Sequence, residues 1–301
     1  MIRLSRRGHV VIACAVLTVP ALAAIGVAEP AYASVPGLQV ISADSATNSS
    51  SPKTAVATCP TGKQVLSVGA RIDGGGGQVL LDDAYPNSSL TSVTAKAYED
   101  DDGTTAQWFI RAYAVCVNAR QNLELVSKTT DASSSPGQSI DFPCPSGKAV
   151  VGVGVAINAG NGNVSLMFMR PISGVGPNRV SVGAREDQDG TANVWSITGY
   201  AICDLALPGQ VLVTATSPLN SSSKSQNANC QDGRVVVGSG VEVIGGNSSS
   251  GAEVNLHELR PPTGQNPSFP LTTFVAATAF EDQDGYSGSW QLRTYAVCAL
   301  P

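Results

Sequence analysis

The sequence contains few charged residues, few aromatic residues and almost no histidine. Charged residues make up 14% of the 301 residues, aromatic residues make up 5%, and there are two histidines. His9 lies near the N-terminus, so His257 is the only histidine in the rest of the chain. A zinc site built on several histidines is therefore excluded, and a Ser-His-Asp triad would have to use His257. No nucleophile-elbow motif accompanies His257, and we expect no catalytic role for it.

Basic residues are also scarce. The chain has 18 lysines and arginines against 23 aspartates and glutamates, which gives a formal net charge of −5. No run of basic residues occurs, so the sequence lacks the positive surface that nucleic acids and anionic membranes bind. We expect neither as a partner.

The N-terminal segment has the parts of an export signal. Three arginines among the first seven residues precede an apolar run from Val10 to Val27, and Ala31-Tyr32-Ala33 follows. This order predicts a signal peptide of residues 1–33. A lipoprotein box at Cys14 would open the apolar run instead of closing it, and His9 stands where a twin-arginine signal needs an apolar residue. No other stretch approaches the length of a membrane span, so we expect a secreted, extracellular protein without membrane contact.

One motif occurs three times in the rest of the chain. Each copy begins with an acidic turn that ends in Asp-Gly or Asp-Asp-Gly and continues through Trp to Tyr-Ala-[Val/Ile]-Cys. Such a fixed frame indicates a tandem repeat, and we place the repeats at residues 37–120, 121–206 and 207–301. The motif runs from Glu99 to Cys116, from Glu186 to Cys203 and from Glu281 to Cys298.

Each repeat has about six segments typical of β-strands and no convincing helical pattern. Apolar alternation marks the strands, and Pro- and Gly-rich stretches mark the turns between them. A unit of about 85 residues with six strands has the size of a small antiparallel sandwich or barrel. The sequence therefore predicts an all-β protein of three tandem antiparallel units, with a pseudo-threefold arrangement as one option.

Six cysteines remain after the signal peptide, two in each repeat. An even number of cysteines in an exported chain indicates disulfides. The threefold repetition favours one bridge within each repeat, and each would stabilise its repeat by roughly 4 kcal/mol in the chain-entropy model. The alternative joins consecutive repeats through Cys116–Cys144 and Cys203–Cys230 and leaves Cys59 for Cys298. The favoured pairs are Cys59–Cys116, Cys144–Cys203 and Cys230–Cys298.

Three short motifs together resemble repeats found in uncharacterised secreted proteins of actinomycetes. These are CPxGK at Cys59 and Cys144, EDxDG in the acidic turns, and WxxxxYAxC at the end of each repeat. The resemblance covers nearly all of the chain after the signal peptide and implies export and an all-β fold. It implies no activity. The third repeat departs from the pattern at Gln231 and Asp232, where the Pro is missing.

The three acidic turns hold ten carboxylates, and calcium is the first ligand to consider for them. An EF-type loop needs an oxygen ligand five residues before its Gly, where this chain has Tyr98, Arg185 and Phe280. We therefore predict solvated turns that hold no metal ion and no other cofactor. Weak calcium binding and contact with a partner remain alternatives. The candidate contact residues in the turns are Asp102, Asp189 and Asp284.

The last strand of each repeat places Trp and Tyr on opposite faces. The face of Trp108 also carries Ile110, Ala112 and a disulfide cysteine, so we expect it to face the core. The tryptophans Trp108, Trp195 and Trp290 are then core residues and not platforms for sugar stacking. The tyrosines on the other face either contact a ligand or pack between units. These candidate binding residues are Tyr113, Tyr200 and Tyr295.

These observations favour a secreted, non-enzymatic binding protein that recognises carbohydrate or another cell-surface polymer. Loops displayed three times would multiply a weak site by avidity. A structural extracellular or envelope protein without a small ligand is the first alternative. A glycoside hydrolase that uses paired carboxylates is the second. Against the hydrolase, we expect the acidic turns to be exposed, where nothing raises the pKa of an acid. The sequence does not indicate an oligomeric state.

Overall fold

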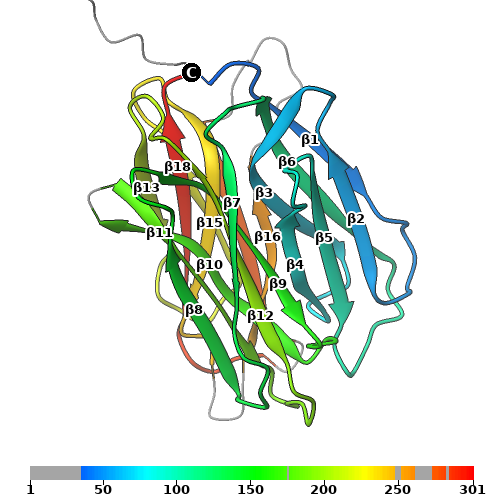
Figure 1. The fold of residues 1–301 in the computed structure, drawn as a ribbon. Coiled ribbons are helices and arrows are strands. Elements are labelled where there is room, and N and C mark those ends of the chain that lie inside the picture. Colours follow the sequence, from blue (N-terminus) through cyan, green and yellow to red (C-terminus); the bar gives the residue numbers. More distant parts are fainter. Residues whose placement is uncertain (1–34, 175, 248–251, 262–272, 283–284) are drawn as a thin grey trace, which may run out of the picture. The chain divides into compact units, whose positions relative to one another are not determined.

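The computed structural model describes the chain after the predicted signal peptide. The chain divides into Met1–Ala31 and Tyr32–Pro301, and all described residues belong to the second unit. Every regular element among them is a β-strand, which confirms the all-β prediction (Figure 1). None of these residues forms a helix long and apolar enough to cross a membrane. The described residues are 35–174, 176–247, 252–261, 273–282 and 285–301.

Each of the three sequence repeats contributes six strands, as predicted. The first repeat forms β1 (Gln39–Asp44), β2 (Lys53–Thr58), β3 (Lys63–Gly74), β4 (Val79–Pro86), β5 (Ser92–Glu99) and β6 (Trp108–Asn118). The second forms β7 (Glu124–Thr129), β8 (Gly137–Pro143), β9 (Ala149–Asn158), β10 (Val164–Gly174), β11 (Gly176–Glu186) and β12 (Ser196–Asp204). The third forms β13 (Val211–Thr216), β14 (Lys224–Asn229), β15 (Val235–Ile244), β16 (Val254–Arg260), β17 (Phe274–Glu281) and β18 (Gln291–Ala299).

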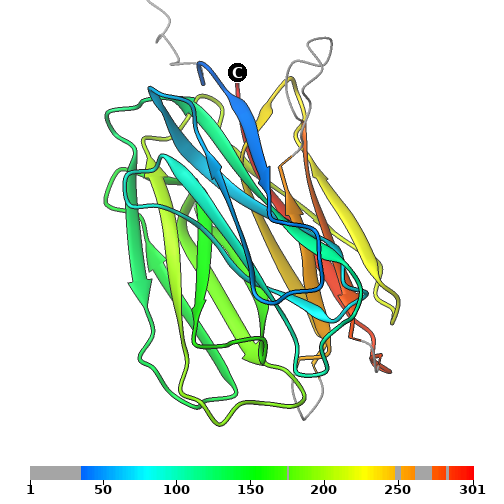
Figure 2. The same ribbon diagram turned by 90° about the vertical axis from the view of Figure 1, so that its right-hand side faces the viewer.

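The strands form three six-stranded antiparallel sheets, and two repeats share each sheet. The strand orders are β1-β6-β3-β16-β17-β14, β13-β18-β15-β10-β11-β8 and β2-β5-β4-β9-β12-β7. Figure 2 shows the blue strands of the first repeat beside the orange and red strands of the third. Each repeat is thus a sandwich of two three-stranded halves, and a half from another repeat extends each of them. The sharing runs from repeat 1 to 2, from 2 to 3 and from 3 to 1, so it closes a ring.

The junction between repeats has the same geometry in all three sheets. The pairs that join the repeats are Asp83 with Ala156, Phe168 with Glu242, and Glu258 with Arg71. A β-bulge immediately precedes the first residue of each pair and leaves one residue unpaired. The bulged residues are Asp82, Met167 and His257.

The three central strands β3, β9 and β15 approach one another closely where the sheets meet. A Cβ atom on Gly152 would lie 2.1 Å from the carbonyl oxygen of Leu66, so only glycine fits there. In the same region, the Ser239 hydroxyl on β15 donates to the Val68 carbonyl on β3 at 2.8 Å. The sheets therefore share one core and do not form three separate ones.

The tryptophans and the disulfides lie in this core. Trp108, Trp195 and Trp290 are at most 1% exposed, which confirms that they are core residues. The cysteines pair within each repeat as favoured, and each bridge joins the two halves of one sandwich. The disulfides are Cys59–Cys116, Cys144–Cys203 and Cys230–Cys298.

Candidate functional site

The structure brings the acidic turns of different repeats together. The Asn163 amide, which precedes β10, donates to Asp101 at 2.8 Å and to the Gly190 carbonyl at 3.2 Å. These contacts connect the acidic turns of the first and second repeats. These two turns therefore belong to one cluster and do not stand apart on separate units.

Two carboxylates of this cluster are not the solvated groups that we predicted. Burial raises the pKa of Asp187 to about 6, and repulsion from Asp189 and Asp101 adds to the shift. Burial also raises the pKa of Asp100 to about 7, with repulsion from other turn aspartates. The expectation that nothing in these turns raises the pKa of an acid is therefore wrong. Their turn geometry is as predicted, since Asp100 and Asp187 accept the N–H groups of the Gly three residues later, at 2.9 and 3.0 Å.

The first residue of each acidic turn has a structural role that the sequence did not reveal. The glutamate accepts a hydrogen bond from the indole N–H of the buried tryptophan nine residues later, and these bonds measure 2.6, 2.9 and 2.8 Å. A buried indole N–H needs such a partner. The spacing of Glu and Trp was visible in the repeat, but their contact depends on how the turn folds back. The pairs are Glu99–Trp108, Glu186–Trp195 and Glu281–Trp290.

Two of the three candidate contact residues of the turns lie among the described residues. Asp102 and Asp189 are exposed, and Asp284 lies outside the described residues. Within the described part of the chain, no group of three His, Cys, Asp or Glu side chains is placed to hold a metal ion.

The candidate tyrosines lie at the junctions between repeats, and they differ in their surroundings. Tyr113 is 1% exposed, which leaves its ring almost no surface for a ligand and favours the predicted alternative, packing between units. Tyr200 is half-buried and stacks on Tyr85 at a centroid distance of 5.3 Å. Tyr295 is 6% exposed, but it lines a surface groove. Tyr295 therefore belongs to a groove, and that groove has a distinct set of polar groups.

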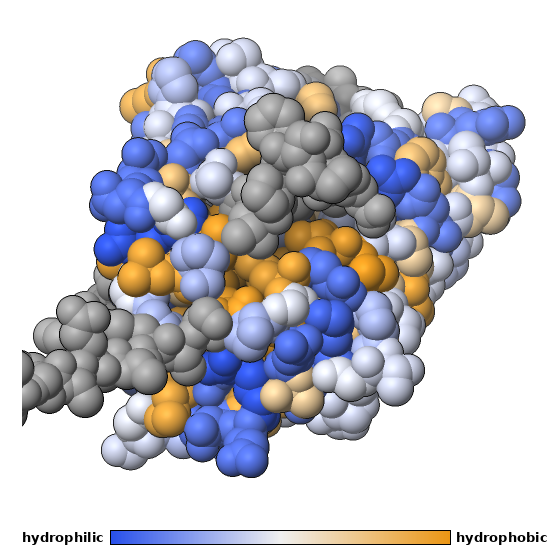
Figure 3. Space-filling model, turned by 90° about the horizontal axis from the view of Figure 1, so that it is seen from above, coloured by the Kyte–Doolittle hydropathy of each residue, from blue (hydrophilic) through white to orange (hydrophobic). Residues whose placement is uncertain are grey.

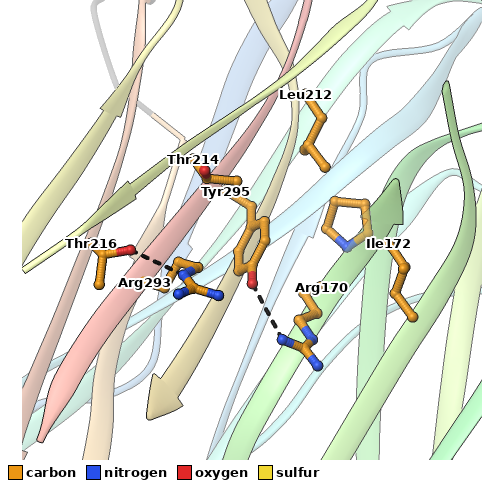
Figure 4. Close-up of a pocket in the computed structure, with 8 residues that line it drawn as sticks. Arg170, Ile172, Leu212, Thr214, Thr216, Arg293 and Tyr295 are labelled. Carbon is orange, nitrogen blue, oxygen red and sulfur yellow. Dashed lines mark hydrogen bonds between the residues drawn. The ribbon is translucent and has the colours of Figure 1, made fainter. Parts of the chain in front are cut away.

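The groove beside Tyr295 has a volume of about 400 Å³ and lies on the sheet that the second and third repeats share (Figure 4). Strand β18 supplies Tyr295 and Arg293, and β13, at the edge of the sheet, supplies Leu212, Thr214 and Thr216. Strand β10 supplies the opposite wall from another repeat. Figure 4 shows the Tyr295 hydroxyl pointing across the groove toward Arg170. The lining residues are Arg170, Pro171, Ile172, Leu212, Thr214, Thr216, Arg293 and Tyr295.

A single carboxylate holds the polar groups of this groove in place. Tyr295 Oη donates to Glu242 Oε2 at 2.6 Å, and Arg170 forms an ion pair with the same carboxylate. Arg293 Nη1 lies 3.5 Å from Glu242 Oε2, and its Nε donates to Thr216 at 3.0 Å. Burial and the bond to Glu242 raise the pKa of Tyr295, so its hydroxyl stays protonated. Two guanidinium groups therefore share one carboxylate, which leaves the groove with a net positive charge.

One donor in the wall of this groove has no partner. Arg170 Nε is buried and makes no hydrogen bond in the described structure. Buried polar atoms without a partner are rare in proteins. The arginine side chain also passes over the Phe168 ring, 5.0 Å from its centroid, which holds the guanidinium near the groove. The groove therefore presents more donors than the protein itself satisfies.

The equivalent positions of the other two sheets carry different side chains and contacts. In the sheet of the first and third repeats, Asp44 stands where Thr216 stands here and forms two hydrogen bonds with Arg111. In the sheet of the first and second repeats, Tyr85 takes the place of Arg170 and stacks on Tyr200. Among the described residues, the side chains of this groove are therefore not repeated in the other two sheets.

Sequence reasoning missed Arg170, Glu242 and Arg293. A signal for the first was present, because the residue before the repeated proline of each repeat is Tyr85, Arg170 or Arg260. A change from aromatic to basic at one repeat position marks a place where the copies differ in chemistry.

The end of the sheets that carries the C-terminus shows a different kind of surface. Figure 3 shows apolar side chains gathered at the centre of this end, with hydrophilic residues around them. Leu300, which follows β18, is 36% exposed. Nothing among the described residues indicates what would cover this patch, so it adds nothing to the site.

Comparison with known proteins does not extend this description. No protein-family model matches the chain, and no curated protein matches it at a significant level.

Proposed function

We propose that the chain is an exported, non-enzymatic protein that binds an acidic polysaccharide or a similar cell-surface polymer in the groove beside Tyr295. One observation carries this proposal. Arg170 and Arg293 face the groove with a single carboxylate, Glu242, between them. The excess positive charge lies in an otherwise acidic chain, whose formal net charge is −5. A ligand with its own carboxylate or sulfate group would complete the charge balance.

The remaining lining of the groove suits a sugar. An arginine fork matches a carboxylate in two parallel hydrogen bonds. Beside it, the hydroxyls of Thr214 and Thr216 can exchange hydrogen bonds with sugar hydroxyls. Leu212 and Ile172 offer an apolar surface for the C–H groups of the ring. Small-molecule sites are commonly of this kind, with an apolar wall and a few placed polar groups.

The three disulfides support the exported part of the proposal. Disulfides form and persist in oxidising compartments, and three intramolecular bridges are present here. They indicate an oxidising environment, and release from the cell follows as a proposal from the predicted signal peptide. The same disulfides would also suit a structural extracellular protein without a small ligand, so a binding measurement has to separate the two functions.

A calorimetric titration tests the proposal. We expect the protein without residues 1–33 to bind polygalacturonate, a polymer of acidic sugars, and not dextran, which is neutral. Arg293→Gln should weaken this binding by about tenfold or more, because an interaction with a charged group contributes roughly 1.5–3 kcal/mol. Arg111→Gln removes the same charge from the equivalent position of another sheet and serves as the matched control.

Three outcomes would contradict the proposal. Absence of binding to polygalacturonate would favour a structural protein. Equal loss in both arginine variants would show that net charge, and not the groove, holds the polymer. Release of new reducing ends during the titration would favour a hydrolase.

A further inference from the structure

We propose that a second groove, on the sheet shared by the first and third repeats, binds a neutral sugar ring against the side chains of Phe280 and His257. This site has different walls from the Tyr295 groove and lies on another sheet, so it does not depend on the function proposed above. Its volume is about 460 Å³. Strands β3, β16 and β17 line it, together with the glycine-rich turn that follows β3.

His257 stands in the wall of this groove without a full set of partners. It is the bulged residue of β16, it is 5% exposed, and its Nε2 is buried without a hydrogen bond. Burial lowers the pKa of this imidazole to about 4, so the ring is neutral near pH 7. A neutral imidazole has one donor and one acceptor nitrogen, and both need partners when buried. A sugar hydroxyl, which both donates and accepts, satisfies either tautomer.

Phe280 gives the groove an aromatic wall. The side chain is 40% exposed, and it is the one aromatic residue among the exposed large hydrophobic side chains of the described structure. Its ring meets His257 edge to face, with centroids 4.7 Å apart and an interplanar angle of 72°. An exposed aromatic ring next to an unpaired polar atom offers an apolar surface and a hydrogen bond within one site, and a sugar ring presents both kinds of group.

The charges around the groove cancel one another. Arg71 pairs with Asp73 on β3, and Arg260 pairs with Glu258 on β16. Both carboxylates retain lone pairs that can accept sugar hydroxyls. With two cations and two anions, the groove favours a neutral ligand, in contrast to the net positive charge beside Tyr295.

A groove at the equivalent position between the second and third repeats differs from this one in the residues that would hold the sugar. There Met167 replaces His257, Arg185 replaces Phe280, and Ile244 replaces Asp73. The backbone and the bulge are the same, but the aromatic residue of this groove is Phe168, at the position of Glu258. The groove has no aromatic ring at the position of Phe280 and no histidine at the bulge. It therefore serves as an internal reference for the proposed site.

An NMR titration of the ¹⁵N-labelled protein tests the inference. The probes are N-acetylglucosamine, methyl α-mannopyranoside and methyl β-glucopyranoside, each added to tens of millimolar. We expect at least one of them to shift the amide signals of Arg71, His257 and Phe280 in a saturable way. The signals of Met167 and Ile244, in the reference groove, should not move.

Two variants separate a binding role from a structural one. Phe280→Leu keeps an apolar side chain but removes the aromatic face, and it should weaken binding about fivefold or more. His257→Leu removes the unpaired nitrogen, so it should fold at least as stably as the parent and yet lose binding. If His257 has only a structural role, the affinity of this variant will be unchanged.

The outcomes also separate this site from the Tyr295 groove. Arg293→Gln should leave the sugar titration unchanged, and Phe280→Leu should leave polygalacturonate binding unchanged. If none of the three sugars shifts the named signals, or if both groove variants bind as the parent does, the inference is wrong.

Discussion

Replacing Glu186 by leucine tests whether the bond between glutamate and tryptophan stabilises each repeat. Glu186 Oε1 accepts the indole N–H of Trp195 at 2.9 Å, and Trp195 is 1% exposed. Leucine at position 186 leaves the buried N–H without an acceptor, which costs about 1–3 kcal/mol. In domains of roughly 150–250 residues, a little smaller than this one, each kcal/mol lowers Tm by about 2–4 °C. We therefore expect a fall in Tm of about 2–12 °C.

The matched control for this substitution is Glu186→Gln. Both variants remove one negative charge beside Asp187, so relief of the repulsion between acids contributes equally to both. Only Glu186→Gln keeps a side-chain oxygen that can accept the hydrogen bond from the indole N–H of Trp195. Thermal unfolding followed by near-ultraviolet circular dichroism, which reports on the buried tryptophans, should show Glu186→Gln close to the parent and Glu186→Leu well below it. Equal Tm values for the two variants would refute the role of the bond.

Three further predictions concern stability. Because the pKa of Asp187 is raised from 3.8 to about 6, the folded state binds its proton more tightly than the unfolded state, and this contribution to stability is lost as the pH rises from about 4 through 6. In urea denaturation, Asp187→Asn should therefore raise the free energy of unfolding by about 1–2 kcal/mol at pH 7.5 and have little effect at pH 4. An equal effect at both pH values would contradict this reasoning. Gly152→Ala should prevent folding or lower Tm by more than about 10 °C, because its Cβ would lie 2.1 Å from a backbone oxygen. Gly137→Ala should be tolerated, because no atom lies nearer than 3.8 Å to its Cβ, and similar Tm values for the two variants would count against the close approach of the central strands. Removing the bridge with Cys144→Ala and Cys203→Ala should cost about 4 kcal/mol in urea denaturation, and a loss below 1 kcal/mol would argue against a stabilising staple.

Much of the fold was predictable because the repeats preserve local rules. The period-two alternation of the last strand placed Trp108 and its equivalents in the core and Tyr113 on the opposite face, as found. The paired spacing of the cysteines favoured the observed bridges. Both inferences depend on side-chain direction along a single strand or on the repeat itself.

Sharing of the sheets between repeats was not predictable from local patterns. The alternation of a strand tells which face is buried but not which strand lies beside it. The same limit applies to the groove, whose residues Arg170 and Tyr295 are 125 positions apart in the sequence. Burial of Asp187 was missed for a related reason. Its exposure depends on two segments far from it in the sequence, which bring Asn163 of the same repeat and Ala252 of the third repeat against the acidic turn.

The most direct test of the proposed function is a crystal structure of the protein with trigalacturonate. The proposal predicts a sugar carboxylate within hydrogen-bond distance of Arg293 or Arg170 and sugar hydroxyls near Thr214 and Thr216. The partnerless Arg170 Nε gives an additional marker, since a bound ligand should supply its acceptor. Trigalacturonate bound at any other surface while this groove holds only water would contradict the proposal.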